Sequence, residues 1–220
     1  MTKNQAEEIL RILRNTFTLP KWITSNREPF KTLIVTIISQ NTADRNTAKA
    51  FENLSKQFEV TPEALANAEK SKIEECLKVA GLYRNKAKTI KQVSKLILEK
   101  FHGDLGPILS TPFEEARKTL LQLPGVGPKT ADVVLLFCAE KPAIPVDTHV
   151  NRVSKRLGLA PNGDYEAVRK SLQTLYSPKD YLALHVLLIL LGRKYCKARK
   201  PLCKQCPVNT RCPSKQIGIK

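Results

Sequence analysis

No apolar run in this sequence of 220 residues is long enough to cross a bilayer. The longest run, residues 182–191, contains His185 and falls well short of the roughly 20 residues that a membrane-spanning helix needs. The first residues show a polar, amphipathic helix pattern in place of a secretory or other targeting signal. We therefore expect no membrane association, and a cytoplasmic protein that lies at the nucleoid if the source is prokaryotic.

Acidic residues are scarce relative to basic ones. There are 20 Asp and Glu against 37 Lys and Arg, which gives a net charge of +17 at pH 7. Such an excess favours a polyanionic partner, and with a membrane set aside that partner is nucleic acid. A soluble protein with a lysine-rich surface has the same composition, so the charge alone favours nucleic acid only modestly.

The sequence also lacks the alternation of apolar and polar residues that is typical of half-buried strands, and it has no repeats or low-complexity segments. Apolar residues recur at helical spacing instead, as at Ile90, Val93 and Ile97. The β-branched run at 35–38 lies inside such a pattern, and we interpret it as buried helix. The chain is therefore predicted to be helical almost throughout.

Helix starts are marked by capping residues. Pro29 and the Thr-Pro-Glu sequence at 61–63 predict two of them, while Ser71 and Thr111, each followed three positions later by Glu, predict capping boxes. The proline-rich stretch at 141–145 must be extended around its prolines. We interpret that stretch as a connector between domains.

Residues 123–131 read Leu-Pro-Gly-Val-Gly-Pro-Lys-Thr-Ala and have the form of a tight glycine hairpin between two helices. Glycine allows positive φ and close approach of another molecule to the backbone N–H groups. Pro128 suits the first position of the second helix, whose amino-terminal end attracts anions. Lys129 would lie beside a bound phosphate, which suggests chemistry on nucleic acid. The alternative is that Lys129 is one surface lysine among many.

Asp147 follows the proline-rich connector and precedes a helical pattern at 148–153. The simpler interpretation is a helix N-cap, because capping aspartates are common and catalytic ones are rare. The two roles are compatible. A carboxylate held by helix N–H groups stays ionised and has a fixed direction, which suits electrostatic support of a developing cation.

Four of the six cysteines have the spacing Cys196-x6-Cys203-x2-Cys206-x5-Cys212. Disulfides are disfavoured, because nothing indicates an oxidising compartment. Zinc more often uses two separated Cys-x2-Cys pairs, whereas iron–sulfur clusters accept compact single-loop spacings. The spacing predicts a structural metal site and leaves the metal open.

Taken together, the hairpin, the Val-Asp-Thr-His-Val sequence at 146–150 and the cysteine loop resemble the endonuclease III family of DNA glycosylases, within the helix-hairpin-helix superfamily. The resemblance runs from about residue 29 to residue 212. It implies an all-α fold of two helical lobes with a DNA-binding cleft between them. The helix-hairpin-helix lobe would span residues 27–140, and the iron–sulfur cluster lobe residues 1–26 plus 141–220.

The resemblance also implies roles for individual residues. Lys129 matches the family's catalytic lysine, which attacks C1′ of a damaged nucleotide, expels the base and forms a Schiff base before β-elimination cuts the strand 3′ to the lesion. Asp147 matches the essential aspartate that assists departure of the base. A [4Fe–4S] cluster would be held by Cys196, Cys203, Cys206 and Cys212.

Contacts with DNA are implied at three places. Leu82 matches a leucine that wedges into the duplex, although a core leucine is as good an interpretation of the sequence alone. A polar residue that fills the void left by the flipped base falls on Gln40 or Asn41, of which we prefer Gln40. The hairpin residues whose amides hold a phosphate are Gly125, Val126 and Gly127.

The predicted function is that of a bifunctional glycosylase and abasic-site lyase acting, as a monomer, on double-stranded DNA with a damaged base, most of all an oxidised pyrimidine, or an abasic site. One alternative is a monofunctional mismatch glycosylase, whose members generally lack a lysine at position 129. Another is a catalytically silent DNA-structure binder, against which Lys129 and Asp147 both argue. Leu191 departs from the family pattern, where many members have His, and puts one family contact in doubt.

Overall fold

The computed structural model describes residues 1–20, 27–160 and 163–216. Helices follow one another along these ranges and no strand occurs in them, so the all-α prediction is confirmed. The chain forms two compact units. We call Asn26–Lys141 the hairpin unit, and Met1–Ser25 together with Pro142–Lys220 the cysteine unit. None of the described helices has the length and apolar character needed to cross a membrane.

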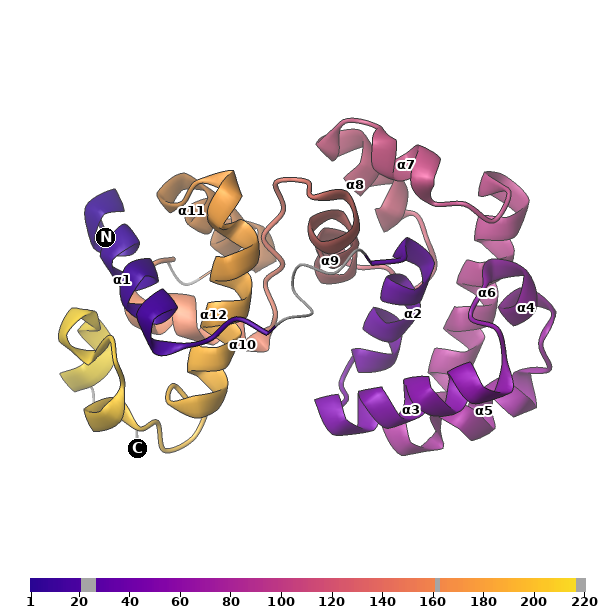
Figure 1. The fold of residues 1–220 in the computed structure, drawn as a ribbon, viewed down its shortest axis with the longest axis horizontal. Helices are drawn as coiled ribbons and strands as arrows, with labels where there is room; N and C mark the ends of the chain where they lie inside the picture. Colours follow the sequence, from indigo (N-terminus) through magenta and orange to yellow (C-terminus); the bar gives the residue numbers. More distant parts are fainter. Residues whose placement is uncertain (21–26, 161–162, 217–220) are drawn as a thin grey trace. The chain divides into compact units, whose positions relative to one another are not determined.

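In the hairpin unit, α2 contacts both α9 and α6 (Figure 1). The β-branched run at 35–38 lies within α2 as predicted, and Ile34, Ile37 and Ile38 have no exposed surface. The helices of this unit are α2 (Pro29–Ser39), α3 (Asp44–Gln57), α4 (Pro62–Asn67), α5 (Lys70–Leu77), η2 (Lys78–Ala80), α6 (Tyr83–Phe101), α7 (Gly106–Ser110), α8 (Phe113–Leu121) and α9 (Pro128–Ala139).

Two of the predicted helix starts are confirmed. The helix α2 begins at Pro29, where the carboxylate of Glu28 accepts hydrogen bonds from the N–H groups of the first turn. The helix α4 begins at Pro62, and the Thr61 hydroxyl accepts from the N–H of Ala64 at 3.2 Å. In both cases proline occupies a position where its missing N–H costs no hydrogen bond.

The two predicted capping boxes are wrong. Helix α5 begins at Lys70, which places Ser71 inside the first turn. Helix α8 begins at Phe113, and the Thr111 hydroxyl donates to the carbonyl of Ile108 at 2.8 Å. Hydroxyl side chains bond to whichever backbone group lies near, so a hydroxyl with Glu three positions later does not fix the cap.

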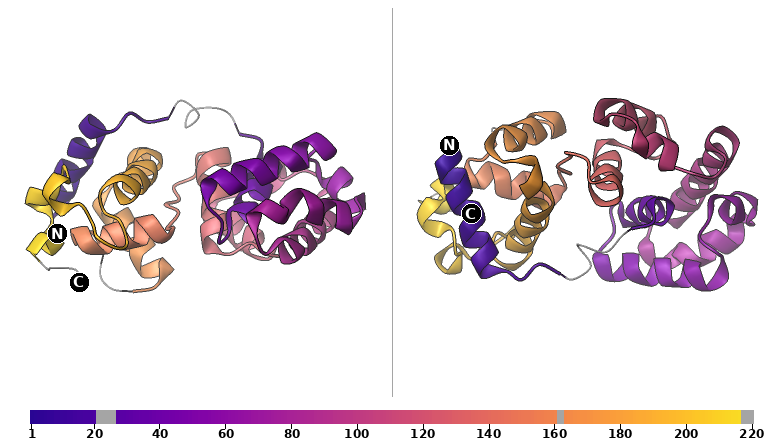
Figure 2. Two further views of the ribbon diagram at one scale, coloured as in Figure 1. Left: turned by 90° about the horizontal axis from the view of Figure 1, so that it is seen from below. Right: turned by 45° about the horizontal axis from the view of Figure 1, so that its top comes forward.

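In the cysteine unit, α1 packs against α11 and α12. The guanidinium of Arg211 pairs with the carboxylate of Glu8 at 2.8 Å, and Figure 2 shows α1 beside the carboxyl-terminal segment that carries Arg211. The helices of this unit are α1 (Lys3–Thr16), α10 (Thr148–Leu157), α11 (Tyr165–Leu175), η3 (Pro178–Asp180), α12 (Tyr181–Lys194), η4 (Cys203–Gln205), η5 (Asn209–Arg211) and η6 (Pro213–Gln216).

Candidate functional site

The glycine hairpin joins α8 to α9 by a tight turn. The N–H of Val126 donates to the carbonyl of Leu123 at 3.1 Å, and α9 then begins at Pro128 with Gly127 at its N-cap. Val126 is buried and its N–H is already bonded to Leu123, so it helps to close the turn. Helix α9 therefore begins at the hairpin, and the N–H groups of its first turn and its dipole favour an anion there.

The two hairpin glycines differ in what requires them. Gly125 has φ +73°, and a Cβ on it would lie 2.2 Å from Cγ2 of Thr89, so the fold itself needs glycine there. Gly127 has φ −92°, and a Cβ on it would meet nothing within 4 Å. The described chain therefore gives no internal reason for glycine at position 127, and the space beside its backbone is open.

A buried ion pair fixes the two helices of the hairpin. Nε of Arg117 on α8 donates to Oδ1 of Asp132 on α9 at 2.7 Å, and both side chains are buried. Lys129 lies three residues before Asp132, in the first turn of α9, and is half-buried. Because removing one partner of a buried pair is strongly destabilising, the pair holds the backbone that carries Lys129.

Gln40 and Asn41 lie in different surroundings at the end of α2. The amide of Gln40 donates to the carbonyl of Gly125 at 3.0 Å and to the hydroxyl of Thr130 at 3.4 Å. It therefore ties α2 to the hairpin within this unit. Asn41, in contrast, is exposed and has φ +53°.

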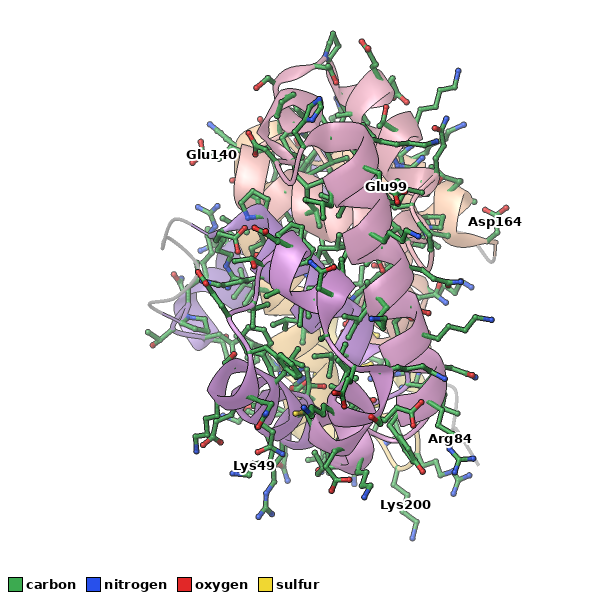
Figure 3. All side chains as sticks on the ribbon, turned by 90° about the vertical axis from the view of Figure 1, so that its right-hand side faces the viewer. Lys49, Arg84, Glu99, Glu140, Asp164 and Lys200 are labelled. Atoms are coloured by element: carbon green, nitrogen blue, oxygen red, sulfur yellow. The ribbon has the colours of Figure 1, made fainter. Side chains whose placement is uncertain are left out.

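Leu82 is not a core residue. Its side chain is 59% exposed, its φ is +48°, and the preceding Gly81 has φ +65°. Figure 3 shows Arg84 projecting from the beginning of α6, close in sequence to Leu82, while Glu99 lies towards the other end of that helix. An exposed leucine at a strained turn beside a cation suits a contact with DNA better than it suits packing.

Asp147 caps α10, as the simpler interpretation predicted. Its Oδ1 accepts from the N–H of Val150 at 2.7 Å. The carboxylate forms no other hydrogen bond within the described residues, and the side chain is half-buried. One oxygen of the carboxylate is thus fixed by the helix.

The connector before Asp147 is anchored on both sides. Nδ1 of the buried His185 lies 2.9 Å from the carbonyl of Pro145 and must carry the proton, because a carbonyl only accepts. The N–H of Val146 donates to the phenolic oxygen of Tyr165 at 3.3 Å. His185, which interrupts the longest apolar run, therefore has a structural role next to Asp147.

The four cysteines of the loop line a single cavity, together with Leu191 and other residues. None of the four is in a disulfide. Across residues 1–20, 27–160 and 163–216, no three His, Cys, Asp or Glu side chains are grouped closely enough to hold one metal ion. A zinc ion needs its thiolates about 2.3 Å from one point, whereas a multi-iron cluster binds its thiolates through separate irons. Four cysteine thiols around one cavity are donors that suit either kind of metal site.

The cavity disfavours the negatively charged form of these thiols. Burial raises the pKa of Cys206 to about 11, with a further contribution from the neighbouring thiols, and burial raises the pKa of Cys212 as well. The Arg156 guanidinium donates to Sγ of Cys196 at 3.5 Å. Four thiolates could coexist in this cavity only with a bound cation to offset their charge.

Two arginines on α10 hold the segment that enters the cysteine loop, and the sequence analysis missed both. Nε of Arg152 donates to the carbonyl of Cys196 at 3.0 Å. Arg156 donates to the carbonyls of Lys197 at 2.7 Å and Ala198 at 3.1 Å. The same helix carries the Asp147 cap at its beginning, so α10 links the carboxylate to the cysteine loop.

Comparison with known proteins gives consistent results. The HhH-GPD superfamily of base excision DNA repair proteins matches residues 34–178. Endonuclease III of Sulfolobus acidocaldarius is 39% identical over 188 residues, which cover 84% of this chain and 82% of that protein. Endonuclease III of Thermotoga maritima is 37% identical over 187 residues, covering 84% and 83%.

Solved structures agree with these relatives. A trapped endonuclease III–DNA covalent intermediate matches with a TM-score of 0.87 and 32% identity, covering 100% of both chains. A thermostable thymine-DNA glycosylase matches with a TM-score of 0.76 at 24% identity, covering 96% of this chain and 94% of that one. The second match shows a shared fold alone.

Proposed function

The chain belongs to the endonuclease III family of the HhH-GPD superfamily, and on this basis we propose how its residues act in base excision repair. It is a DNA glycosylase and abasic-site lyase. We assign the lyase chemistry to Lys129. The observation that carries the assignment is the position of this amine, in the first turn of α9 beside a hairpin whose Gly127 leaves its backbone open.

In the proposed reaction, the neutral amine of Lys129 attacks C1′ of the damaged nucleotide. The bond between C1′ and the base breaks, and the base leaves with the electron pair and takes up a proton. The nitrogen gives up one proton to a general base, and its lone pair then opens the sugar ring. The C1′–O4′ bond breaks, O4′ takes up a proton, and the product is a protonated imine. Loss of a proton from C2′ then drives β-elimination of the 3′ phosphate, and water releases the lysine. Covalent catalysis divides one difficult step into easier ones.

We propose Asp147 as the second catalytic residue. Its fixed carboxylate supports positive charge on the sugar as the base leaves and accepts a proton during the reaction. Replacement by Asn separates this role from capping, because Asn caps helices as well as Asp does. We expect Asp147→Asn to keep the stability of the fold and to slow base release by about 100-fold or more. Unchanged base release would remove Asp147 from the mechanism.

The DNA contacts follow from the exposed residues of the hairpin unit. We propose that Leu82 enters the base stack beside the flipped nucleotide, and that Asn41 fills the void, since the amide of Gln40 is bonded to Gly125. Backbone N–H groups of the hairpin would hold a phosphate without reading sequence. Binding should therefore weaken by about 0.9 log unit per log unit of salt for each phosphate neutralised.

Borohydride reduction of the protein with an abasic-site duplex tests the Schiff base. Wild-type protein should give a covalent adduct with DNA, and Lys129→Ala should give none. Lys118→Ala is the matched control, because Lys118 is an exposed lysine on α8, the other helix of the hairpin. Adduct formation by Lys129→Ala, or its loss in Lys118→Ala, would contradict the assignment.

For the substrate, we propose oxidised pyrimidines. Single-turnover release of an oxidised pyrimidine from a duplex should exceed release of thymine from a thymine–guanine mismatch. Release of the mismatched thymine with no trapped adduct would instead identify a monofunctional mismatch glycosylase. Binding without release or adduct would identify a DNA-structure binder.

We propose that Cys196, Cys203, Cys206 and Cys212 hold a [4Fe–4S] cluster. All four thiols line one cavity, and their burial calls for a compensating cation. When bound, the cluster supplies a covalent cross-link that orders the basic loop after α12. Arg152 and Arg156 position the start of that loop through its carbonyls.

The purified protein should be yellow-brown, with absorbance near roughly 400 nm from thiolate-ligated iron. Metal analysis should find iron in proportion to protein. A colourless protein with one equivalent of zinc would refute the cluster.

A further inference from the structure

A buried lysine on α6 connects two loops that carry the proposed DNA-inserting residues. We call residues 40–42 and 80–82 the insertion loops; they carry Asn41 and Leu82. Nζ of Lys86 donates to the hydroxyl of Thr42 in one loop, and to the carbonyl of Ala80 in the other at 3.0 Å. The ammonium group therefore joins two segments that lie far apart in the sequence.

The contacts form a closed network. The Thr42 hydroxyl donates to the carbonyl of Ala80 at 2.6 Å, which directs its lone pairs to the ammonium group of Lys86. The backbone N–H of Lys86 donates to the carbonyl of Leu82 at 3.0 Å. That backbone bond belongs to the first turn of α6, so the lysine side chain itself holds the second insertion loop through the carbonyl of Ala80.

Packing alone does not explain a lysine at this position. Its side chain is only 5% exposed, and within the described residues it forms no ion pair. Burial lowers the pKa of Lys86, so the charged group is held here against a desolvation cost. Methionine would fill a similar volume without that cost. The hydrogen bonds to the two insertion loops are what the ammonium group adds.

Both insertion loops have a backbone that needs support. Asn41 has φ +53° and Leu82 has φ +48°, a region that residues other than glycine rarely adopt. Such conformations persist where the surroundings hold them in place, and they cluster at functional sites. The network of Lys86, Thr42 and Ala80 lies directly beside both strained residues.

We propose that Lys86 is a positioning residue that holds the two insertion loops together as one rigid wedge for opening the DNA duplex. The inference rests on the proposed roles of Asn41 and Leu82. A rigid wedge lowers the cost of extruding a nucleotide, because the inserting side chains do not have to be ordered when they meet the base stack. Lys86 itself touches neither the base nor the sugar in this role.

The test compares borohydride trapping of an abasic site in a duplex and in a single strand, since a single strand needs no opening. Lys86→Met should slow trapping on the duplex by about tenfold, and leave the single-strand rate within about twofold. A tenfold loss corresponds to ~1.4 kcal/mol, close to the effect of losing one hydrogen bond from a charged group. Equal losses on both substrates would overturn the proposal.

Lys91→Met is the matched control. Lys91 lies on the same helix and donates to the carbonyls of Ala66 and Ala68 at the end of α4, away from the insertion loops. Its loss should leave the ratio of duplex to single-strand rates unchanged. If Lys91→Met lowers the ratio of duplex to single-strand rates as much as Lys86→Met does, then any loss of a lysine contact on α6 slows trapping on the duplex. That result would refute the role of Lys86.

Thr42 provides a second route if Lys86→Met does not fold. Thr42→Val keeps the shape and removes the hydroxyl, so it should lower the duplex rate selectively, whereas Thr42→Ser should retain the wild-type ratio. In one network, Lys86→Met combined with Thr42→Val should cost little more than the worse single change. A fully additive loss would contradict a shared network.

The fluorescence of 2-aminopurine, placed opposite a stable abasic analogue in a duplex, reports unstacking of the base on binding, without any bond being broken. Wild-type protein at saturation should raise the fluorescence as the base unstacks, and Lys86→Met should give a smaller rise. An equal rise would refute the wedge. If wild-type protein traps no abasic DNA at all, the proposed lyase fails, and this fluorescence comparison still decides the role of Lys86.

Discussion

Exchanging the two hairpin glycines for alanine, one at a time, should separate folding from DNA binding. Gly125→Ala places a Cβ 2.2 Å from Cγ2 of Thr89, far inside the ~3.5–4 Å of a normal carbon contact. Overpacking of this kind costs about 1–3 kcal/mol, and the positive φ of +73° adds roughly 1–2 kcal/mol for a residue with a Cβ. We expect the free energy of unfolding to fall by about 2–5 kcal/mol.

Gly127→Ala should behave in the opposite way. Its φ of −92° and ψ of 179° suit alanine, and the added Cβ meets no atom within 4 Å. We therefore expect unchanged stability, or a gain of about 0.4–1 kcal/mol from the stiffer unfolded chain. The methyl group does occupy the space beside the hairpin amides. Affinity for an abasic-site duplex should fall about tenfold, as for one lost charge-assisted hydrogen bond.

Urea-unfolding midpoints and fluorescence-anisotropy titrations with labelled duplex measure the two effects. Thr89→Ser removes the clashing methyl group, so adding it to Gly125→Ala should restore the packing part of the loss and leave the part due to φ. Wild-type DNA affinity in Gly127→Ala would refute the reasoning that an external backbone approaches this residue.

Three further outcomes are expected. Leu82→Ala should leave the urea midpoint nearly unchanged, because the side chain is exposed and such changes stay within about 0.5 kcal/mol; single-turnover excision from duplex DNA should slow, and an unchanged rate would exclude the wedge role. Arg117→Met should lower the free energy of unfolding by about 3–5 kcal/mol, because the carboxylate of Asp132 stays buried without this ion pair; a loss under about 1 kcal/mol by urea denaturation would contradict that estimate. Arg156→Met should speed the decay of absorbance near roughly 400 nm under a chelator, because the donor to Sγ of Cys196 and two loop carbonyls is gone; equal decay rates would show that Arg156 does not hold the loop.

The features that the sequence predicted correctly are formed by residues close together along the chain. The hairpin and the Asp147 cap are local structures, in which the residue types and their spacing already determine the backbone. The predicted capping boxes at Ser71 and Thr111 are local as well, yet both predictions were wrong. Ser71 lies inside the first turn of α5, and the Thr111 hydroxyl donates to the carbonyl of Ile108 instead. Local patterns therefore predicted the elements better than their ends.

Lys86 was missed because its acceptors come from residues 42 and 80, which no local pattern brings together. A signal was present nevertheless. Lys86 lies four residues before Ile90 and seven before Val93, and thus on the apolar face of α6. A lysine on an apolar face is a reason to look for a buried acceptor. Arg156 carries no such signal, because its partners in the cysteine loop become neighbours only in the folded unit.

The length of α10 is fixed by what lies at its two ends. It begins with the Asp147 cap and carries Arg156 near its other end, and its ten residues span about 15 Å. One residue inserted within this helix would turn everything beyond it by about 100° and shift it by about 1.5 Å. Arg156 would then face away from Cys196 while Asp147 kept its cap. Related sequences should therefore contain no insertion within α10.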